Sequence, residues 1–284
     1  MVPINKISKG LSIMSTIQSP ILSFCSTCMN RGESLKKTLP HNNNIINNYN
    51  GLVEMVLVNF IKDDESLKLH DWILQQKNSD FMNYRVCKEM FFWNMPKARN
   101  TSHMSAKGSY LINLDCDNFI SANTIDKLLE LNKKKKLNKY IFCGYRGRIK
   151  KKFRPWKRKN FRTTFKFLRG EHFHDGSYGN IGLPKDLFIS LGGYNEALPP
   201  MGGDDDDLFK RAVCIKKKII HIPSDIAPVT NSKEEGLVNT INPKIDWLEW
   251  AQSSEEITKA SLLNNMLKCN MNMPIGLETS DGKF

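Results

Sequence analysis

The sequence predicts an α/β fold in a single domain, with a mostly parallel central sheet flanked by helices. Short apolar runs of strand length alternate with segments of helical spacing, which is the pattern of βαβ units. The 284 residues include 40% hydrophobic residues, enough for one sizeable core. The sequence has no run of about twenty apolar residues, so it predicts no membrane-spanning helix.

The first part of the chain predicts a strand, a helix and a second strand. The apolar run 21–25 has the length of a buried strand and leads into a turn sequence. Residues 33–39 are expected to form a helix that Pro40 closes, because proline disrupts a helix interior. The Asn-rich stretch 41–50 is expected to be a loop. The apolar run 53–60 then predicts the second strand.

The pattern repeats in the middle of the chain. A helix is expected at 66–75, where apolar residues recur at helical spacing, and a strand at 110–114. Thr124 is expected to cap the next helix, and a lysine run at 133–136 suits the negative end of that helix. A further strand is expected at 140–145.

The pattern breaks at a basic and aromatic segment, 146–170. Regular structure resumes with a helix at 184–191, which begins with a proline and ends at two glycines. A helix from about Asp205 and a strand at 218–222 complete the series. The predicted organisation is a polar leader at 1–20, one domain at 21–231 and a partly helical tail at 232–284. Within that domain we expect a first half at 21–118 and a second half at 171–231.

Charge and cysteine content narrow the function classes. The chain carries 42 Lys and Arg against 29 Asp and Glu, a net charge of +13. Such an excess indicates an anionic partner, which could be nucleic acid, a membrane surface or a phosphorylated small molecule. The aromatic residues of the basic segment could stack on bases or insert into a membrane surface, or the segment could be a solvated flap. Seven scattered cysteines exclude a complete disulfide framework, and with the polar leader they favour a cytoplasmic protein.

Two groups of carboxylates interrupt the basic background. Asp115 and Asp117 follow the strand at 110–114, and carboxylates spaced in this way can converge on Mg²⁺ or Mn²⁺. The alternative is a solvated turn. The second group, 204–207, follows Gly202-Gly203, where glycine lets the backbone approach a ligand closely, and a carboxylate there can act as a general base. The alternative is that these acids only stabilise a helix N-terminus.

Several short motifs occur in a fixed order between about 21 and 231. They are Thr27-Cys28-Met29-Asn30-Arg31, Lys97-Ala98-Arg99-Asn100, Asp115-Cys116-Asp117, Gly179-Asn180-Ile181-Gly182, Gly192-Gly193-Tyr194-Asn195-Glu196 and Gly202-Gly203-Asp204-Asp205-Asp206-Asp207. Together they resemble a family 2, GT-A-type glycosyltransferase with a C-terminal half similar to that of the β-1,4-galactosyltransferases. Each motif is weak by itself, and their order and spacing make the resemblance specific.

The resemblance implies an inverting hexosyltransferase. It implies transfer of a sugar from a nucleotide-diphosphate donor, preferably a UDP-sugar, to a hydroxyl of a glycan, lipid-linked sugar or protein. Asp115 and Asp117 are expected to hold Mn²⁺ or Mg²⁺ as a DXD motif, and Asp205 to be the catalytic base. The other implied donor-binding residues are Thr27, Arg31, Asn59, Lys97, Arg99 and Asp115 itself, and the implied acceptor-binding residues are Asn180, Gly203 and Asp204.

The sequence departs from the family pattern at two places. Asn59 stands where the family usually has Asp, and residues 227–231 lack the His that often contacts the metal. The basic segment occupies the place of a mobile loop, which could form a lid over the donor or touch a membrane.

Two other functions compete with this interpretation. A nucleic-acid-binding protein would use the basic and aromatic segment, but its acids would repel phosphates. A metal-dependent nuclease or nucleotidyltransferase would use paired acids to hold two metals. The two acid groups fit one cation and one general base better than they fit two metal ions. Because the acids would also repel phosphates, no nucleic-acid partner is expected.

Overall fold

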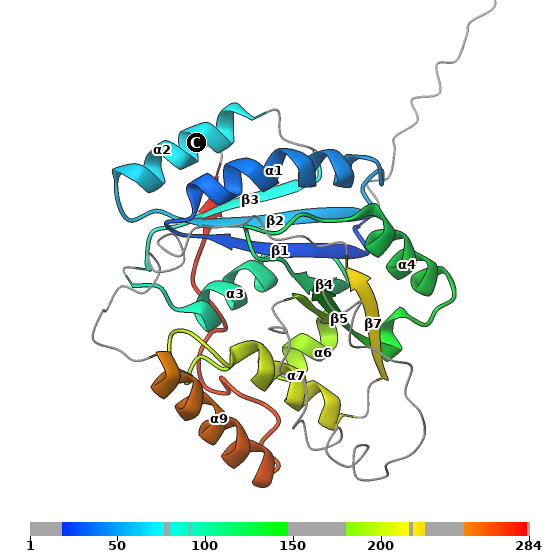
Figure 1. The fold of residues 1–284 in the computed structure, drawn as a ribbon, viewed down its shortest axis with the longest axis vertical. Coiled ribbons are helices and arrows are strands. Elements are labelled where there is room, and N and C mark those ends of the chain that lie inside the picture. Colours follow the sequence, from blue (N-terminus) through cyan, green and yellow to red (C-terminus); the bar gives the residue numbers. More distant parts are fainter. Residues whose placement is uncertain are drawn as a thin grey trace, which may run out of the picture.

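A mixed sheet forms the centre of the molecule (Figure 1). The structure is a computed structural model that describes residues 19–76, 80–90, 92–146, 180–215, 218–224 and 247–282. In this part of the chain the sheet has eight strands in the order β7-β5-β6-β4-β1-β2-β3-β8. Two of them, β6 and β8, run antiparallel to their neighbours, and the other six share one direction. The predicted fold class, an α/β domain with a mostly parallel sheet, is confirmed.

The strands and helices have the following bounds. The strands are β1 (Leu22–Cys28), β2 (Val53–Phe60), β3 (Met82–Cys87), β4 (Tyr110–Asn113), β5 (Tyr140–Arg146), β6 (Ile181–Pro184), β7 (Lys218–Ser224) and β8 (Ser280–Asp281). The helices are α1 (Gly32–Asn47), α2 (Asp64–Gln75), α3 (Met95–Met104), α4 (Ala122–Lys133), the short 3-10 helix η1 (Leu137–Lys139), α6 (Lys185–Ser190), α7 (Asp204–Cys214) and α9 (Trp247–Leu263). Every strand and helix expected from the sequence is present; β2 has the expected bounds, and the others have shifted ends.

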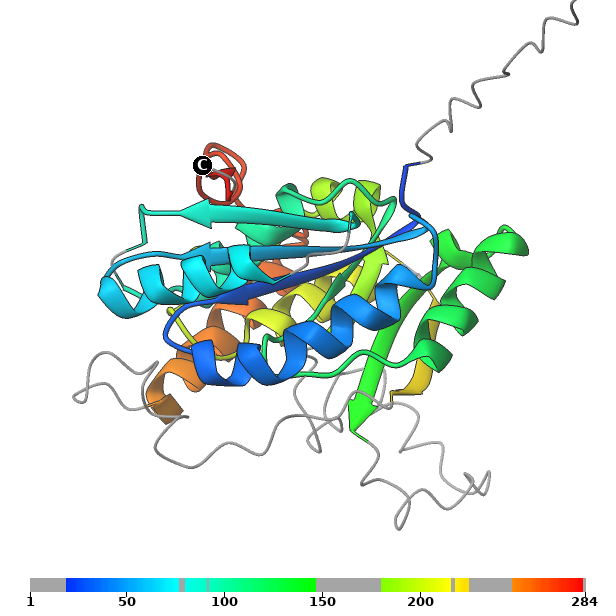
Figure 2. The same ribbon diagram turned by 90° about the horizontal axis from the view of Figure 1, so that it is seen from above.

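Helices cover both faces of the sheet (Figures 1 and 2). Helices α1, α2 and α4 pack on one face, where their apolar residues share a core with Phe24 and Leu57. Helices α6 and α7 pack on the other face, over Cys25 and Val56. Successive residues of a strand point to opposite faces, so these neighbours on β1 and β2 enter different cores. Both faces are buried, which explains why the strands read as continuous apolar runs.

Helix α1 is longer than the sequence predicts. It continues through Pro40 and most of the Asn-rich stretch 41–50, so the predicted loop and the predicted helix end are wrong. Pro40 lies on the exposed side and removes one helical hydrogen bond. Asn42 is buried: its Nδ2 donates to the Asn118 carbonyl at 3.0 Å, and its Oδ1 accepts from the Ile120 amide at 2.9 Å. These contacts with a distant segment favour the helix over the local preference for a loop.

Three elements near the site were not expected from the sequence. Strand β3 extends the sheet beyond β2, and β6 lies between β4 and β5. Helix α3 is buried almost all round, including residues 98–103, so it lacks the one-sided apolar pattern that reveals a helix. Asn94 caps it, because the Asn94 side chain accepts from the Lys97 amide at 3.0 Å.

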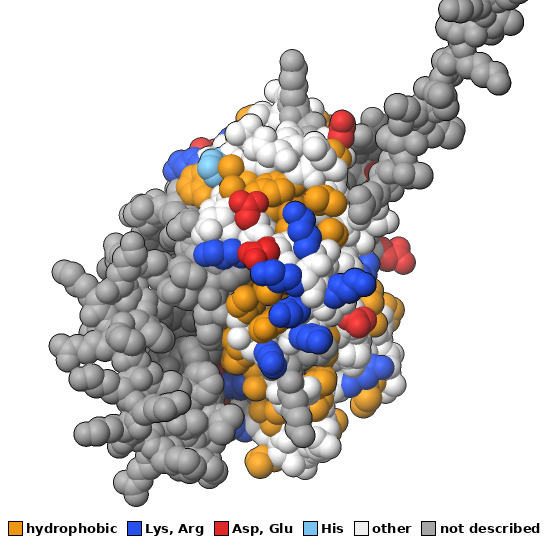
Figure 3. Space-filling view, turned by 90° about the vertical axis from the view of Figure 1, so that its right-hand side faces the viewer, with side chains coloured by type: hydrophobic (Ala, Val, Ile, Leu, Met, Phe, Trp, Pro, Cys, Tyr) orange, Lys and Arg blue, Asp and Glu red, His pale blue; other side chains and the backbone are white. Residues whose placement is uncertain are grey.

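The beginning of α4 also differs from the prediction. Its cap is Ser121, whose Oγ accepts from the Thr124 amide at 3.3 Å, whereas Thr124 itself lies inside the helix. Lys133 is the last residue of α4, the lysines 134–136 follow it, and all four are exposed. Figure 3 shows Lys and Arg side chains gathered on the side of the molecule where α4 lies. Part of the positive charge is therefore concentrated on a face of the folded domain.

Some expectations lie outside the described residues. These are most of the predicted leader, the basic segment beyond Arg146, residues 227–231 and the boundary near 231. Among the described helices, none is both long and apolar enough to cross a membrane.

Candidate active site

The carboxyl ends of parallel strands bring several of the expected site residues to one edge of the sheet. Cys28 is paired with Asn59 in the register of β1 and β2, so Thr27 and Asn59 lie at neighbouring strand ends. Strand β4 pairs with β1 on the other side, and Asp115 follows β4 after one intervening residue. Ligands of open α/β sheets bind at this edge, where strand order reverses.

Asp115 and Asp117 each contact an arginine. Asp117 Oδ2 accepts from Arg31 Nη2 at 2.8 Å. Asp115 Oδ1 accepts from Arg99 Nη2 at 3.3 Å and from Asn113 Nδ2 at 3.2 Å. The Asp115 and Asp117 side chains remain 38% and 20% exposed. The two carboxylates are therefore oriented by the protein and still accessible to a ligand.

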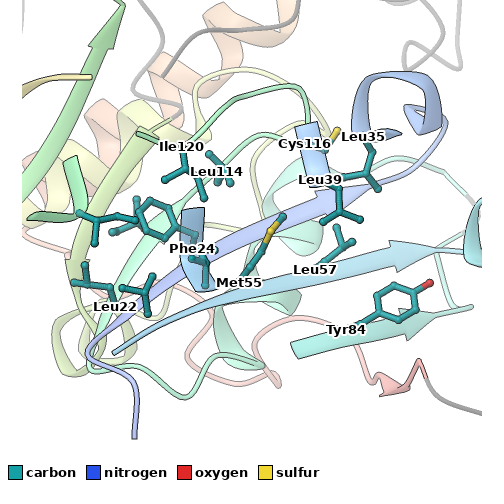
Figure 4. Packing of buried hydrophobic residues seen from close by; sticks show 14 of the residues in the cluster. Leu22, Phe24, Leu35, Leu39, Met55, Leu57, Tyr84, Leu114, Cys116 and Ile120 are labelled. Carbon is teal, nitrogen blue, oxygen red and sulfur yellow. The ribbon is translucent and has the colours of Figure 1, made fainter. Parts of the chain in front are cut away.

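Cys116 anchors the loop between these two acids. Its side chain packs in the core with Leu35 and Leu39 of α1 (Figure 4). The Thr38 hydroxyl, also on α1, donates to the Cys116 carbonyl at 2.6 Å. Because α1 holds both the side chain and the backbone of Cys116, Asp115 and Asp117 on either side of it stay at the carboxyl ends of the strands.

Arg99 connects the two acidic groups that are far apart in the sequence. Its Nη1 donates to Asp204 Oδ2 at 2.7 Å, while its Nη2 contacts Asp115. Arg99 is 5% exposed and Asp204 is 1% exposed. The guanidinium carbon lies 5.5 Å from the centre of the Tyr194 ring, within the range of a cation–π contact. Burial disfavours the charge, but Asp204 and Asp115 raise the pKa of Arg99 well above its usual value.

Asp204 and Asp205 begin α7 directly after Gly203, which has a left-handed φ of 83°. Burial raises the pKa of Asp204 above its usual value, although the Arg99 guanidinium acts in the opposite direction. Burial and the neighbouring Asp204 charge raise the pKa of Asp205 to about 7. Asp205 is partly exposed, so a carboxylate that can accept a proton near neutral pH lies beside the buried ion pair.

The other two acids of this group have different partners. Asp207 is buried and accepts from Arg211 Nε at 2.8 Å, and Arg211 Nη2 donates to the Gly193 carbonyl at 2.8 Å. Asp206 pairs with Lys210 at 3.1 Å nearer the surface. The four acids therefore have different surroundings: Asp204 and Asp205 face Arg99 or lie beside it, Asp207 connects α7 to the Gly193 carbonyl through Arg211, and Asp206 forms a pair within α7.

The remaining predicted residues lie around this centre. Asn59 is buried; its Nδ2 is 3.4 Å from the Tyr84 hydroxyl, and its Oδ1 has no hydrogen-bond partner among the described residues. Lys97 lies on α3 two residues before Arg99. Asn180 is buried, and its Oδ1 accepts from Asn118 Nδ2 at 3.5 Å, which places it beside the Asp117 loop.

The structure adds residues that the sequence analysis did not assign to the site. The Asn100 side chain makes two hydrogen bonds with the backbone of Tyr194. Asn100 Nδ2 donates to the Tyr194 carbonyl at 2.9 Å, and the Tyr194 amide donates to Asn100 Oδ1 at 2.8 Å. Asn270, after α9, donates to the carbonyls of Gly192 and Tyr194 at 2.8 and 2.7 Å. These bonds fix the ring that covers Arg99. Nothing in the local sequence around Asn270 indicates this long-range contact.

Solved structures show the fold. The mannosyltransferase PcManGT from Pyrobaculum calidifontis, in complex with GDP-Man and Mn²⁺, matches with a TM-score of 0.54 at 14% identity, over 88% of this chain and 72% of that one. S. aureus TarS 1-349 in complex with UDP-GlcNAc matches with a TM-score of 0.52 at 12% identity, over 89% of this chain and 74% of that one. These proteins are GT-A glycosyltransferases, and the chain shares their fold.

Sequence comparison identifies the family. No curated protein matches the chain. The similarity of the C-terminal half to the β-1,4-galactosyltransferases is not confirmed and stays a prediction. The family model "Glycosyl transferase family 2" matches residues 23–192, more than half of the chain, including β1, the Arg99 helix and the Asp115 loop. The chain therefore belongs to glycosyl transferase family 2.

Proposed function

We propose that this glycosyltransferase moves a hexose from a nucleoside-diphosphate donor to a hydroxyl acceptor, with inversion at the anomeric carbon. The observation that carries the proposal is the link through Arg99. It joins Asp115, at the strand edge, to Asp204, next to the elevated-pKa carboxyl of Asp205. A site for the leaving diphosphate and a base for the attacking hydroxyl are then adjacent, as a single displacement requires.

The donor is proposed to bind across the ends of β1 and β2. Thr27 and Asn59 lie there, and the buried Asn59 Oδ1, which has no partner in the described part of the chain, is an acceptor suited to a base N–H. PcManGT was solved with GDP-Man and TarS with UDP-GlcNAc. Uracil and guanine both offer such an N–H. We favour a UDP-sugar, with Lys97 near the phosphates.

Asp115 and Asp117 are proposed to hold Mn²⁺ or Mg²⁺. They are accessible oxygen ligands, the type that these hard cations prefer. Among the described residues, no group of three or more His, Cys, Asp or Glu gathers to hold an ion. Two carboxylates fit such a site, because Mg²⁺ is commonly bound by one or two carboxylates together with substrate phosphates and water. When bound, the ion neutralises charge on the leaving diphosphate.

Asp205 is proposed to be the general base. Its carboxylate takes the proton of the acceptor hydroxyl while the hydroxyl oxygen bonds to the anomeric carbon and the nucleoside diphosphate leaves. The pKa of about 7 matches this task, because a base works best when its pKa is near the working pH. Asp204 is occupied by Arg99, so its role is to orient α7 beside the acceptor, which Gly203 and Asn180 approach. The acceptor class proposed is a glycan, a lipid-linked sugar or a protein.

The proposal is tested by incubating the protein with a panel of nucleotide sugars and Mn²⁺ and measuring the nucleoside diphosphate released. Wild type should release it from one donor, and Asp115→Asn should weaken donor binding measured by calorimetry. Asp205→Asn should keep donor binding and lower the transfer rate by about 10²–10⁴-fold, the usual contribution of a general base. Asp206→Asn is the matched control, because it changes an adjacent acid that pairs with Lys210.

The outcomes separate the parts of the proposal. If wild type binds and cleaves no nucleotide sugar, the proposed function is wrong. If Asp205→Asn transfers at the rate of Asp206→Asn, Asp205 is not the base. If Asp205→Asn loses donor binding instead, its carboxylate belongs to the donor site.

A further inference from the structure

The ion pair between Arg31 and Asp117 occupies one of the two carboxylates proposed to bind the metal. Arg31 Nη2 lies 2.8 Å from Asp117 Oδ2, and the two side chains are 16% and 20% exposed. A guanidinium and a divalent cation both bind carboxylate oxygens, and the two positive charges repel each other at short range. A metal ion that approaches Asp117 must therefore compete with Arg31.

Arg31 and Arg99 differ in how firmly they are held. Arg99 is buried and contacts two carboxylates. If it moved away, the Asp204 carboxylate would remain buried without a partner for its charge, which is costly. Arg31 is more exposed, and its Nε is buried without a hydrogen-bond partner among the described residues. A buried donor that lacks a partner costs free energy, so the guanidinium is incompletely satisfied in this arrangement.

The backbone places Arg31 where an anion can be received. Arg31 is the N-cap residue of α1, a helix of 16 residues, and no side chain of the described residues caps its amides. The positive end of a helix favours a negative ligand, and a guanidinium binds phosphate oxygens in a forked geometry. The Arg31 guanidinium, whose Nε has no partner among the described residues, and the N-terminal end of α1 both suit a diphosphate bound beside Asp117.

We propose that Arg31 is a tethered counter-ion: it neutralises Asp117 in the free protein and transfers to the donor diphosphate when metal and donor bind. This inference rests on the proposed function. In the absence of donor, Arg31 competes with the metal for Asp117. In the presence of donor, Arg31 has a new anionic partner, so its departure from Asp117 no longer leaves it unpaired. Metal and donor therefore assist each other's binding through Arg31.

The test measures Mn²⁺ binding by electron paramagnetic resonance of the free ion, with and without a nucleoside diphosphate. UDP and GDP are both tried, and the one that wild type binds more tightly is used. Arg31→Gln removes the charge, and Arg31→Lys keeps it without the forked geometry. Lys36→Gln is the matched control, because Lys36 is a cation on the same helix that pairs with Glu33 at 2.8 Å. Circular dichroism and thermal unfolding verify that each variant is folded.

Arg31→Gln should bind Mn²⁺ alone about fivefold more tightly than wild type, the gain expected when a partly exposed ion pair of about 1 kcal/mol is removed. The same variant should bind the nucleotide more weakly, and the tightening of Mn²⁺ by nucleotide should fall about tenfold. Arg31→Lys should keep Mn²⁺ affinity near wild type and lose part of the nucleotide effect. Lys36→Gln should match wild type in both measurements.

The results distinguish this inference from the proposed function. If wild type binds both Mn²⁺ and nucleotide, but Arg31→Gln leaves the affinity for Mn²⁺ alone unchanged or lowers it, the counter-ion role is overturned and the glycosyltransferase proposal stands. The same conclusion follows if Lys36→Gln changes Mn²⁺ affinity as much as Arg31→Gln. If wild type binds neither ligand, the proposed function fails, and the inference fails with it.

Discussion

Replacing Arg99 with methionine should destabilise the protein strongly, because it leaves Asp204 buried without its cation. The pair is closed at 2.7 Å, with the two residues 5% and 1% exposed. Removing one partner of a buried ion pair typically costs about 3–5 kcal/mol. For a domain of this size each kcal/mol lowers Tm by roughly 2–4 °C, so the loss should be on the order of 10 °C.

A double-mutant cycle isolates the pair. The single variants Arg99→Met and Asp204→Asn and their combination are compared by urea unfolding at one pH. Asp204→Asn should cost less, about 2 kcal/mol, because Arg99 keeps Asp115 as a partner. The double variant should be more stable than the sum of the single losses predicts, with an interaction energy of about 2 kcal/mol. The control is Lys210→Met, which breaks a more exposed pair on α7 and should cost less than about 1 kcal/mol.

The pH dependence gives a second measurement of the same pair. Without Arg99, the pKa of Asp204 rises further, because burial already raises it and Arg99 opposes that shift. A carboxyl whose folded pKa is raised loses stability as the pH increases through that pKa. The penalty of Arg99→Met should therefore grow as the pH rises above the usual pKa of an aspartate. An interaction energy under about 0.5 kcal/mol, with a penalty as flat in pH as that of Lys210→Met, would refute the reasoning.

Three further predictions concern α7 and the turn 192–194, whose Tyr194 ring contacts Arg99. Because the pKa of Asp205 is raised to about 7 in the folded protein, its protonated carboxyl adds to the free energy of unfolding below the pKa of the unfolded chain, and this contribution is lost as the pH rises to about 7. Asp205→Asn should remove this decline in the free energy of unfolding, measured with urea between about pH 4 and 7, and the same pH dependence as wild type would contradict it. Gly203→Ala should cost about 2 kcal/mol, because φ is 83° and an added Cβ would lie 2.6 Å from Ser254 Cβ; since Ser254→Gly removes that Cβ and also a hydrogen bond to the Gly202 carbonyl, the cost of Gly203→Ala should be smaller when it is measured in the Ser254→Gly background, and an equal cost in thermal unfolding would exclude the contact as its cause. Asn270→Ala removes bonds to the carbonyls of Gly192 and Tyr194 and should cost about 2 kcal/mol; hydrogen exchange should increase at this turn, and unchanged protection would show that Asn270 does not hold it.

Local patterns were sufficient for the elements whose residues interact mainly with near neighbours. Strand β2 has the bounds 53–60 expected from its apolar run, because every residue of it is buried. Helix α2 was expected from its apolar spacing, and Asp63 caps it by accepting from the Ser66 amide. Where the decisive contact is distant, the prediction was wrong: Asn42 lies inside α1 and bonds to the segment after Asp117.

The candidate site shows the same division. The sequence alone indicated the family, the two acidic groups and the sheet edge where Asp115 lies, because residue type, order and spacing carry that information. It could not indicate that Asp204 pairs with Arg99, that Asp207 pairs with Arg211, or that Asp205 has an elevated pKa. Four consecutive aspartates are chemically identical in the sequence. Their partners and their pKa values depend on burial and on charges brought near by the fold, so only the tertiary structure distinguishes a candidate base from acids that hold a helix in place.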